Sequence, residues 1–388
     1  MNFRKFGRDG HKVSVLGYGC MRLPTESGKT DGTVIESEAK RLVRHAIDSG
    51  VNYIDTAKVY HDSRCEEIVG KILQNGYREK VLIATKLPIW DVKSKTDADR
   101  IFDEQRRDLK TDRIDVYLLH NIQRGYWDTV QKFDLIEWGI KKRESGEIGY
   151  FGFSFHDSYD FFVEVVNAYD GWDFCQLQYN YVGESVQAGR CGVNYASKRG
   201  MSVVVMEPLL GGCLANPLGK MADLFEWNQH EGRDYQPVDL ALRWIWDQPQ
   251  ISVVLSGMSA YNQVKQNLKI ASRKDYGKLT QEELQFILRL QREYDKSLPI
   301  KCTKCRYCMP CPDGVDIPLN FELYNNHSAI TKMKEEKSEN ILNKILYNSM
   351  SKQQKASNCV KCGKCEKICP QNLPIREYLK TINITFKS

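Results

Sequence analysis

The sequence lacks the segments that take a chain into or across a membrane. It opens with Met1-Asn2-Phe3-Arg4-Lys5 and has no apolar stretch of the kind found in a secretory signal. No apolar run approaches the ~18 residues that a bilayer-spanning helix needs. Low-complexity stretches are also missing. We therefore expect a cytoplasmic protein without a membrane partner.

Cysteine, by contrast, is plentiful: there are thirteen, which in a chain without a secretion signal indicates metal binding in a reducing compartment. Eight of them form two runs. The first run is Cys302, Cys305, Cys308 and Cys311, followed by Pro312. The second is Cys359, Cys362, Cys365 and Cys369, followed by Pro370. Three thiolates at this spacing can bind three irons of a cubane, and the fourth, before proline, usually ligates the other cluster.

The two runs therefore predict two 4Fe–4S clusters. One would use Cys302, Cys305, Cys308 and Cys369, and the other Cys359, Cys362, Cys365 and Cys311. Two structural zinc ions are an alternative, but zinc ligands usually come as separate C-x2-C pairs rather than runs of four. Disulfides are a further alternative, and the reducing compartment disfavours them.

A strong excess of charge of either sign is absent. The formal charge is +6, and each cluster would replace four neutral thiols by roughly −2, which brings the sum to about +2. The positive charge is therefore no sign of nucleic-acid binding. Basic residues that could offset the cluster charge stand directly before or between the ligands: Lys301, Lys304, Arg306, Lys361, Lys364 and Lys367.

The first ~275 residues alternate between strand and helix patterns. Eight short apolar runs predict strands at Val13–Gly19, Val51–Thr56, Lys80–Lys86, Ile114–His120, Ile148–Ser154, Phe174–Tyr179, Ser202–Glu207 and Ile251–Ser256. Helical spacing is clearest between Ala39 and Ile47, before Gly50, and between Cys65 and Leu73, before Gly76.

Eight strands that alternate with helices predict a (β/α)8 TIM barrel, the α/β class. A doubly wound sheet is the alternative. Against it, no G-x-G-x-x-G follows the first strand, where the sequence reads Leu16-Gly17-Tyr18-Gly19-Cys20.

Chemistry in such a barrel lies at the C-terminal ends of the strands. Asp55 ends the second predicted strand, with Tyr60 five residues later, Lys86 ends the third and His120 the fourth. A single Lys or His there is more often a surface or capping residue, but four titratable groups at successive strand ends indicate a site. An aspartate would pair with the lysine, whose charge would lower the tyrosine pKa, and the histidine could orient a carbonyl oxygen.

These four residues resemble, in order, the Asp/Tyr/Lys/His tetrad of the aldo-keto reductases. Asp55-Thr56-Ala57, Ala84-Thr85-Lys86, Leu118-Leu119-His120 and Gly152-Phe153-Ser154 are similar to that family's motifs. The resemblance covers residues 1 to ~290. The C-terminal part resembles the alpha-helical two-cluster ferredoxin module, so the chain is similar to the iron–sulfur branch of the family.

The resemblance implies carbonyl reduction by hydride transfer from NADP or NAD, with Tyr60 as proton donor. Lys86 and His120 would make the proton available, and Asp55 would hold Lys86. Ser154 and Gln178 would hold the nicotinamide carboxamide, with Asn180 nearby. Other nucleotide contacts implied by the family are Met206 against the ring, Pro208, Leu209 and Gly211 under the pyrophosphate, and Ser256, Gly257, Gln263 and Asn267 at the adenosine end.

Two of these positions depart from the family pattern. Met206 stands where an aromatic ring commonly stacks, although its polarizable sulfur can still pack on the nicotinamide. Gln263 stands four residues before Asn267, where NADPH-preferring relatives often carry arginine, and a neutral amide lacks that charge-assisted grip. Lys265 or Lys269 could supply the charge, so both nucleotides stay possible.

The sequence also indicates where the barrel ends and the cysteine-containing C-terminal region begins. Thr280 and Glu283 predict a capping box that opens a helix, and Ser297-Leu298-Pro299 ends it. We expect a barrel over residues 1–278, a connecting helix over 279–298 and a small, mostly helical two-cluster ferredoxin-like domain over 299–388. Short helices are predicted at Ile317–Asn325 and Ile341–Tyr347.

Three functions remain open from the sequence. The first is an NAD(P)H-dependent carbonyl reductase acting on a small molecule. The second is an electron-transfer protein, with a ferredoxin- or flavodoxin-like redox partner, whose barrel binds nucleotide or docks the partner. In the third, the clusters only stabilise the C-terminal fold. The complete tetrad favours the first, whereas the cysteine runs indicate electron transfer, since carbonyl reduction needs no one-electron carrier.

Overall fold

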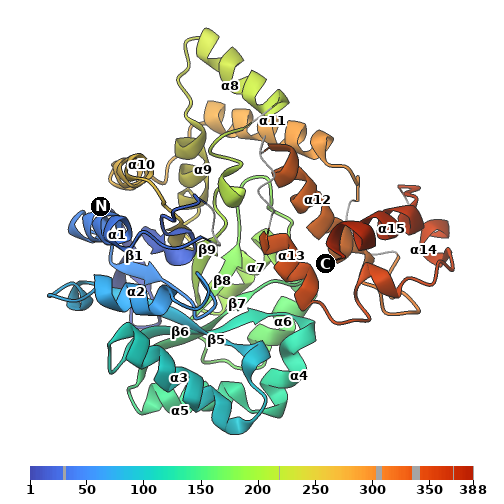
Figure 1. Cartoon of the computed structure of the whole chain (residues 1–388). Coiled ribbons are helices and arrows are strands. Elements are labelled where there is room, and N and C mark those ends of the chain that lie inside the picture. Colours follow the sequence, from blue (N-terminus) through green and yellow to red (C-terminus); the bar gives the residue numbers. More distant parts are fainter. Residues whose placement is uncertain (29–31, 218, 303–307, 334–340, 370, 388) are drawn as a thin grey trace. The chain divides into compact units, whose positions relative to one another are not determined.

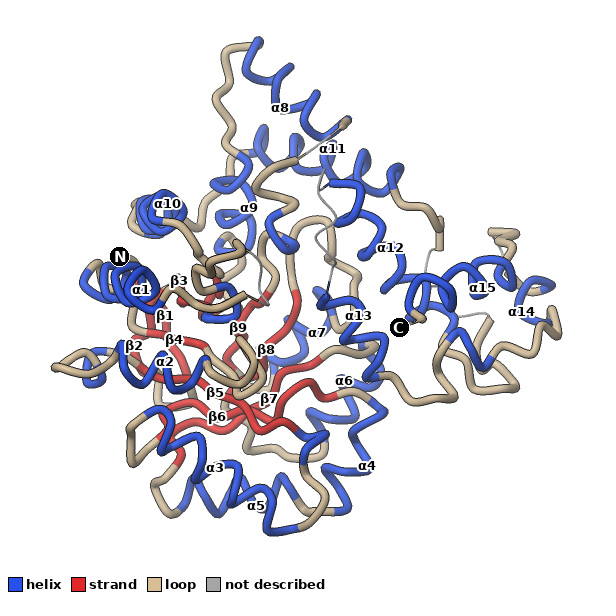
Figure 2. Tube along the Cα trace, viewed as in Figure 1, coloured by secondary structure: helices blue, strands red, loops and turns tan. Residues whose placement is uncertain are grey.

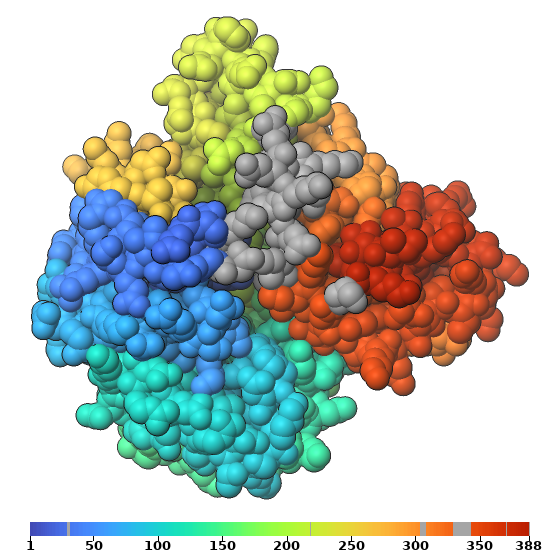
Figure 3. All heavy atoms as spheres, in the orientation of Figure 1, coloured from blue at the N-terminus to red at the C-terminus, as the bar shows by residue number. Residues whose placement is uncertain are grey.

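The computed structural model describes residues 1–388 except 29–31, 218, 303–307, 334–340, 370 and 388, which are grey in Figures 1 and 3. The chain forms two compact units. The first comprises Met1–Ile122, Tyr126–Leu209 and Gln236–Glu283, and the second Gln123–Gly125, Leu210–Tyr235 and Leu284–Ser388.

The first unit is a closed barrel of eight parallel strands in the order β10-β3-β4-β5-β6-β7-β8-β9. The strands are β3 (Leu16–Gly19), β4 (Tyr53–Asp55), β5 (Leu82–Pro88), β6 (Ile114–Ile122), β7 (Ile148–Phe155), β8 (Phe174–Gln178), β9 (Ser202–Met206) and β10 (Ile251–Ser256). Helices surround them (Figure 2). The predicted (β/α)8 barrel is confirmed.

Most of the helices that follow the strands bury one apolar face, whereas the helix Pro237–Trp246 is buried almost all round. They are α1 (Glu36–Asp48), α2 (Cys65–Ile72), α3 (Lys95–Leu109), α4 (Arg124–Lys132), α5 (Leu135–Glu144), α6 (Tyr159–Asn167), α7 (Gly189–Lys198), α9 (Pro237–Trp246) and α10 (Tyr261–Ala271). In α1 the buried side chains are those of the predicted helical stripe, from Ala39 to Ile47. Gly50 then takes a φ of 99°, which a residue with a Cβ rarely adopts.

The first predicted strand is wrong in its extent, because the segment Val13–Gly19 belongs to two strands. Residues His11–Ser14 form β2, which pairs antiparallel with β1 (Phe3–Phe6), and only Leu16–Gly19 enters the barrel. The ring of Phe6 lies 5.7 Å from that of Tyr53 and 5.3 Å from that of Phe174, the first residues of β4 and β8. The hairpin therefore closes the N-terminal end of the barrel, which leaves the opposite end for chemistry.

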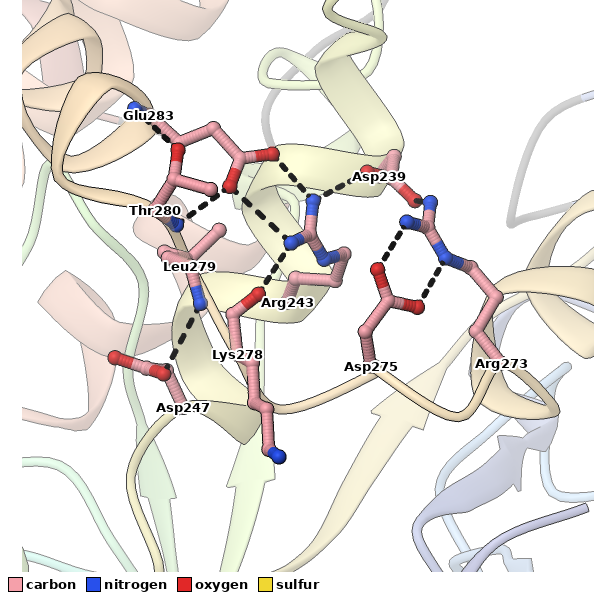
Figure 4. A network of polar contacts seen from close by, with 9 residues as sticks. All are labelled: Asp239, Arg243, Asp247, Arg273, Asp275, Lys278, Leu279, Thr280 and Glu283. Carbon is pink, nitrogen blue, oxygen red and sulfur yellow. Dashed lines mark hydrogen bonds and ion pairs between the residues drawn. The ribbon is translucent and has the colours of Figure 1, made fainter.

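A polar network joins α9 to the start of α11 (Gln281–Ser297) (Figure 4). Arg243 is 4% exposed, and its guanidinium donates to Glu283 Oε1 at 2.6 Å and to Asp239 Oδ2 at 3.1 Å. Arg273 bonds the other oxygen of Asp239 at 2.7 Å. Thr280 N donates to Glu283 Oε2 at 2.7 Å, and Glu283 N to Thr280 Oγ1 at 3.2 Å, so the predicted capping box is present.

The second unit is helical within its described residues. Its helices are α8 (Lys220–His230), most of α11, α12 (Ile317–Met333), α13 (Ile341–Ser349), α14 (Lys364–Lys367) and α15 (Ile375–Phe386). One apolar core, which includes Phe321, Tyr347, Ile382 and Phe386, packs against cysteines of both runs. The predicted small helical domain is confirmed as a fold. None of the helices, over the residues that the structure describes, is long and apolar enough to cross a membrane.

Candidate active site and cysteine sites

The four tetrad residues come together at the C-terminal end of the barrel. Lys86 in β5 donates from Nζ to Asp55 Oδ1 at the end of β4, at 2.7 Å. The same ammonium reaches the carbonyl oxygen of Thr56 at 2.7 Å and the hydroxyl of Tyr60 at 3.4 Å. The ring of His120, in β6, lies edge-on to that of Tyr60, with centroids 6.4 Å apart. β5 and β6 run two residues beyond Lys86 and His120, so both side chains project from within strands.

Burial and charge set the protonation of these groups. Burial opposes the charge of Lys86, which is 2% exposed, but the neighbouring Asp55 and Tyr60 outweigh it and raise the pKa of the ammonium. Burial raises the pKa of Tyr60 to about 12 although Lys86 acts in the opposite direction. Burial and the Lys86 charge hold the pKa of His120 well below its usual range. At neutral pH the arrangement therefore combines a protonated phenol, an ammonium and a neutral imidazole.

Two aromatic side chains that the sequence did not single out lie beside this site. The ring of Trp90 is 5.1 Å from that of His120, and the ring of Tyr126 is 5.8 Å from that of Trp90. Both residues follow a barrel strand closely, which is the one signal that could have found them. They give the site an apolar wall next to Tyr60 and His120.

The residues expected at the nicotinamide lie at successive strand ends. Ser154 in β7 is buried, and its Oγ accepts from Asn121 N at 2.7 Å. Gln178 ends β8 beside Met206, which ends β9, and its Oε1 accepts from Gln187 Nε2 at 3.1 Å. Asn180 is engaged differently, since its amide bonds the Glu207 carbonyl at 3.0 Å and the Gly183 amide at 2.8 Å.

The residues expected at the adenosine end are partly engaged in local structure. Asn267 Nδ2 donates to Ser256 Oγ at 2.8 Å. Gln263 Oε1 accepts from Ser259 N at 2.9 Å and from Ala260 N at 3.2 Å, so it caps α10. A 2′-phosphate would therefore meet an amide already committed to the helix end.

Two further observations concern the residues expected at the adenosine end and under the pyrophosphate of the nucleotide. A Cβ on Gly257 would lie 3.1 Å from the side chain of Arg22, a cation that the sequence did not single out. Arg22 is also 3.9 Å from Glu207. Of the predicted pyrophosphate segment, Pro208 and Leu209 belong to the barrel unit and Gly211 to the second unit.

Five of the cysteines surround one cavity of about 190 Å³ in the second unit. Its lining includes Cys308 and Cys311 of the first run with Cys359, Cys362 and Cys365 of the second. Cys302 and Cys369 pack on the neighbouring core, whereas Cys305 lies outside the described residues. Within the described part, no three His, Cys, Asp or Glu side chains converge on a point as they would around one metal ion. A cubane instead holds its thiolates at separate corners, so a cavity between sulfurs is the space it needs.

Two buried asparagines of α12 tie both cysteine runs to this helix. Asn325 bonds the amide of Ile300 at 3.0 Å and its carbonyl at 2.8 Å, just before Cys302. Asn320 donates to the Gln354 carbonyl at 2.8 Å and accepts from Ala356 N at 2.9 Å, just before Cys359. No sequence motif marks these side chains, because bonds to backbone groups need no partner residue type.

Comparison with known proteins places this geometry in a family. The model "Aldo/keto reductase family" matches residues 15–287, and "4Fe-4S dicluster domain" matches residues 301–373. An uncharacterized oxidoreductase of Bacillus subtilis (strain 168), YqkF, is 26% identical over 317 residues, covering 73% of this chain and 94% of that protein. L-galactose dehydrogenase of Arabidopsis thaliana is 26% identical over 300 residues, covering 73% and 92%.

Solved structures agree with the fold. The holo form of aldo-keto reductase AKR11C1 from Bacillus halodurans is 26% identical, has a TM-score of 0.60 and covers 75% of this chain and 96% of that one. An aldo-keto reductase from Klebsiella pneumoniae, solved in complex with NADPH, shares the fold with a TM-score of 0.60 at 23% identity, with the same coverage. With a family model that spans more than half of its residues, the chain belongs to the aldo/keto reductase family and carries a C-terminal 4Fe-4S dicluster region.

Proposed function

We propose that the protein is an NAD(P)H-dependent reductase of small carbonyl compounds with Tyr60 as the proton donor. The observation that carries this proposal is the buried contact of Lys86 with both Asp55 and the Tyr60 hydroxyl. A buried ammonium needs a compensating partner, and Asp55 is that partner. Burying the Lys86–Asp55 pair costs free energy, and a role of Lys86 in proton transfer from the Tyr60 hydroxyl explains why the pair is buried.

Each tetrad residue has one task in this proposal. A bound nicotinamide would supply the hydride to the carbonyl carbon. Tyr60 gives its proton to the carbonyl oxygen as negative charge develops there. Lys86 stabilises the resulting phenolate, and Asp55 keeps Lys86 in place and charged. His120, neutral at working pH, orients the carbonyl oxygen with an N–H donor.

The proposed nucleotide contacts are Ser154, Gln178 and Met206 at the ring and Ser256, Gly257, Gln263 and Asn267 at the adenosine end, with Pro208, Leu209 and Gly211 at the pyrophosphate. Ser154, Gln178 and Met206 end neighbouring strands, which supports a shared ligand. Gln263 bears no charge, and its oxygen caps α10. We therefore keep both NADH and NADPH as cofactors.

We further propose two 4Fe–4S clusters, held by Cys302, Cys305, Cys308 and Cys369 and by Cys359, Cys362, Cys365 and Cys311. The common cavity of Cys311 with Cys359, Cys362 and Cys365 supports the second set. We propose the domain limits 1–278, 279–298 and 299–388 for the barrel, the connecting helix and the cluster domain. Helix α11, over Gln281–Ser297, supports the middle segment.

Electron transfer is the second candidate function, with a ferredoxin- or flavodoxin-like protein as partner. The observation that favours it is the exposure of Cys362, one of the residues that line the cavity. A purely structural cluster has no need of a ligand at the surface.

The reductase proposal is tested with cofactor deuterated at the nicotinamide C4 and a panel of small aldehydes and ketones. Deuterium should appear in the product alcohol, and Tyr60→Phe should slow its formation by roughly 10²–10⁴ while nucleotide binding, followed by fluorescence, is retained. Tyr53→Phe is the matched control, because the Tyr53 hydroxyl is buried without a hydrogen-bond partner. Turnover of Tyr60→Phe within about threefold of the control would remove Tyr60 from the mechanism.

A further inference from the structure

The cavity that Cys311 shares with the second cysteine run reaches the protein surface. Cys362 is exposed. Val360 and Ile368, which also line the cavity, are 62% and 53% exposed. Single exposed apolar side chains are common, so these two alone indicate nothing. Their position beside the proposed cluster ligands, together with the charges around them, makes them informative.

The exposed charges around this opening are mainly positive. Lys361 and Lys364 line the cavity, and Lys367 directly precedes Ile368 in the chain. All three are exposed, and none of them forms an ion pair among the residues that the structure describes. The carboxylate of Glu366, in the same segment, is bonded by the Arg376 side chain at 2.8 Å and by its backbone amide at 2.8 Å. The arginine thus neutralises Glu366 and leaves the three lysines uncompensated.

One exposed carboxylate, Glu377, follows the cavity-lining Arg376, whereas another negative charge lies further in. Asp313 lines the cavity and is partly buried. A bound cluster with its four thiolates would add roughly −2 inside the cavity. The outer rim therefore keeps a net positive charge, while the charge of the cluster would be enclosed. A partner that approaches from solvent meets the rim first.

We propose that this face, formed by Val360, Lys361, Lys364, Lys367 and Ile368 around Cys362, docks an acidic one-electron carrier protein. The inference rests on the proposed assignment of the second cluster. One electron passes between the carrier's centre and the cluster; the donor is oxidised by one electron and the acceptor reduced by one. No bond is formed or broken and no proton moves.

The three features of the face serve different parts of such an encounter. The lysines attract the acidic partner over a distance of about a Debye length, ~8 Å at physiological ionic strength. Val360 and Ile368 offer apolar contact once the partner has docked, as in small transient interfaces with polar rims. Cys362 is exposed and, as a ligand of the proposed cluster, would give a covalent route from the cluster to the surface.

The test uses the anaerobic holoprotein and a flavodoxin, an acidic FMN protein, in its hydroquinone form. Cluster reduction is followed by stopped-flow absorbance. The variant Lys361→Glu/Lys364→Glu/Lys367→Glu should be reduced roughly tenfold or more slowly than the wild type at low salt, with the difference shrinking as ionic strength rises. Its binding to oxidised flavodoxin, measured by calorimetry, should weaken in parallel.

The matched control is Arg292→Glu/Lys352→Glu/Lys387→Glu, with the same change in net charge at exposed residues of the same unit that do not line the cavity. It should behave like the wild type. Equal slowing of both triple variants, or of neither, overturns the proposal. For the apolar contact, Val360→Ser should slow reduction, whereas Ile384→Ser, at a residue 66% exposed on α15, should not.

Two measurements separate this inference from the cluster assignment. Iron and acid-labile sulfide report whether each variant still holds its clusters, and photoreduced deazaflavin, a small reductant, reports whether they can be reduced without docking. Loss of iron from the lysine variant would show that its slower reduction comes from a lost cluster, and Val360→Ser would then decide the docking face. A wild-type cluster that deazaflavin reduces but flavodoxin neither reduces nor binds would refute the face.

Discussion

Glu66 is a buried residue behind the active site with an unusual environment. It is 1% exposed, and its Oε1 accepts from Thr85 Oγ1 at 2.5 Å and from Gln105 Nε2 at 2.8 Å, while its Oε2 has no partner. Gln105 also donates to the Lys86 carbonyl at 3.0 Å. Burial raises the pKa of Glu66 to about 7. The carboxyl therefore supports the strand that carries Lys86 and resists ionisation.

This pKa predicts how stability depends on pH. The native state binds the Glu66 proton more tightly than the unfolded state, whose pKa is about 4.5, so the free energy of unfolding falls as pH rises from about 4.5 to 7. The Glu66→Gln variant should not show this loss. Its free energy of unfolding should exceed that of the wild type by up to about 3 kcal/mol at pH 8, with little difference at pH 5. Anaerobic thermal and urea unfolding at both pH values measure it.

The neighbouring exposed residue offers the control for this prediction. Glu67→Gln removes a carboxylate whose pKa is lowered by its hydrogen bond to Lys71, so it should not stabilise the protein at pH 8. A Glu66→Gln effect that is the same at pH 5 and pH 8 would show that the carboxyl does not titrate as described.

The candidate catalytic residues could be predicted because position and type coincide: Asp55, Lys86 and His120 are polar residues that interrupt or end apolar strand patterns. Trp90 and Tyr126 could not, since an aromatic residue after a strand is as typical of a core as of a site. The sequence also did not predict that Gln263 caps α10, because the same side-chain amide can either cap a helix or bind a ligand.

At the scale of single elements, α12 organises the cysteine region. Asn320→Ala would leave the amide of Ala356 without its side-chain partner, at roughly 1–3 kcal/mol. The Gln354 carbonyl would lose one of its two bonds and keep the one from Asp316 N at 3.1 Å. The segment before Cys359 should then loosen. We expect less bound iron and sulfide per chain and faster bleaching of cluster absorbance in air.

A second asparagine of the same helix serves as control for that experiment. Asn326 is buried but makes none of the bonds to the cysteine-run segments described above. Asn326→Ala should therefore retain more iron than Asn320→Ala. Equal iron content in the two variants would mean that α12 does not position the second run through Asn320.

Helix α9 is joined to the start of α11 by Arg243, and the strength of this joint is testable. Arg243→Met would leave the buried carboxylate of Glu283 without its cation, which should cost about 3 kcal/mol of unfolding free energy, whereas the half-buried Asp239 keeps Arg273. Arg273→Met is the control: Arg273 is 38% exposed, and its ion pairs should contribute about 0–1 kcal/mol. Denaturant titration measures the unfolding free energy of both variants. Similar losses in the two would show that burial of the ion pair does not determine its contribution to stability.

Most barrel strands were predictable within about two residues, because strands that are buried on both faces leave short continuous apolar runs. The hairpin was not, since Val13 and Ser14 continue an apolar run into β3 and nothing local reveals their pairing with Arg4 and Phe3. Similarly, no local pattern indicates that Leu210–Tyr235 belongs with the C-terminal residues in one unit. Long-range pairing of this kind is a property of the folded chain.

For the whole molecule, the cluster assignment predicts a composition. Anaerobic analysis of the purified protein should give about eight iron atoms and eight acid-labile sulfides per chain. Zinc should be absent from the cysteine runs. About four of each would show that the shorter first run does not support a second cluster, and the Cys311→Ser and Cys302→Ser variants would identify the set that remains.

The closure of the barrel by the N-terminal hairpin has a consequence for the order of events on the ribosome. Asn2 Nδ2 bonds the Ala271 carbonyl at 2.8 Å, Arg4 Nη1 bonds the Ile251 carbonyl at 2.6 Å, and β3 pairs with β10. The first residues made must therefore wait for some of the last residues of the barrel. The hundred or so residues from Ser256 to Cys369 follow, which takes roughly 5–25 s at 5–20 residues per second. A nascent barrel can thus close before the second cysteine run leaves the ribosome, so that insertion of the proposed clusters would be a late step performed on an already folded barrel.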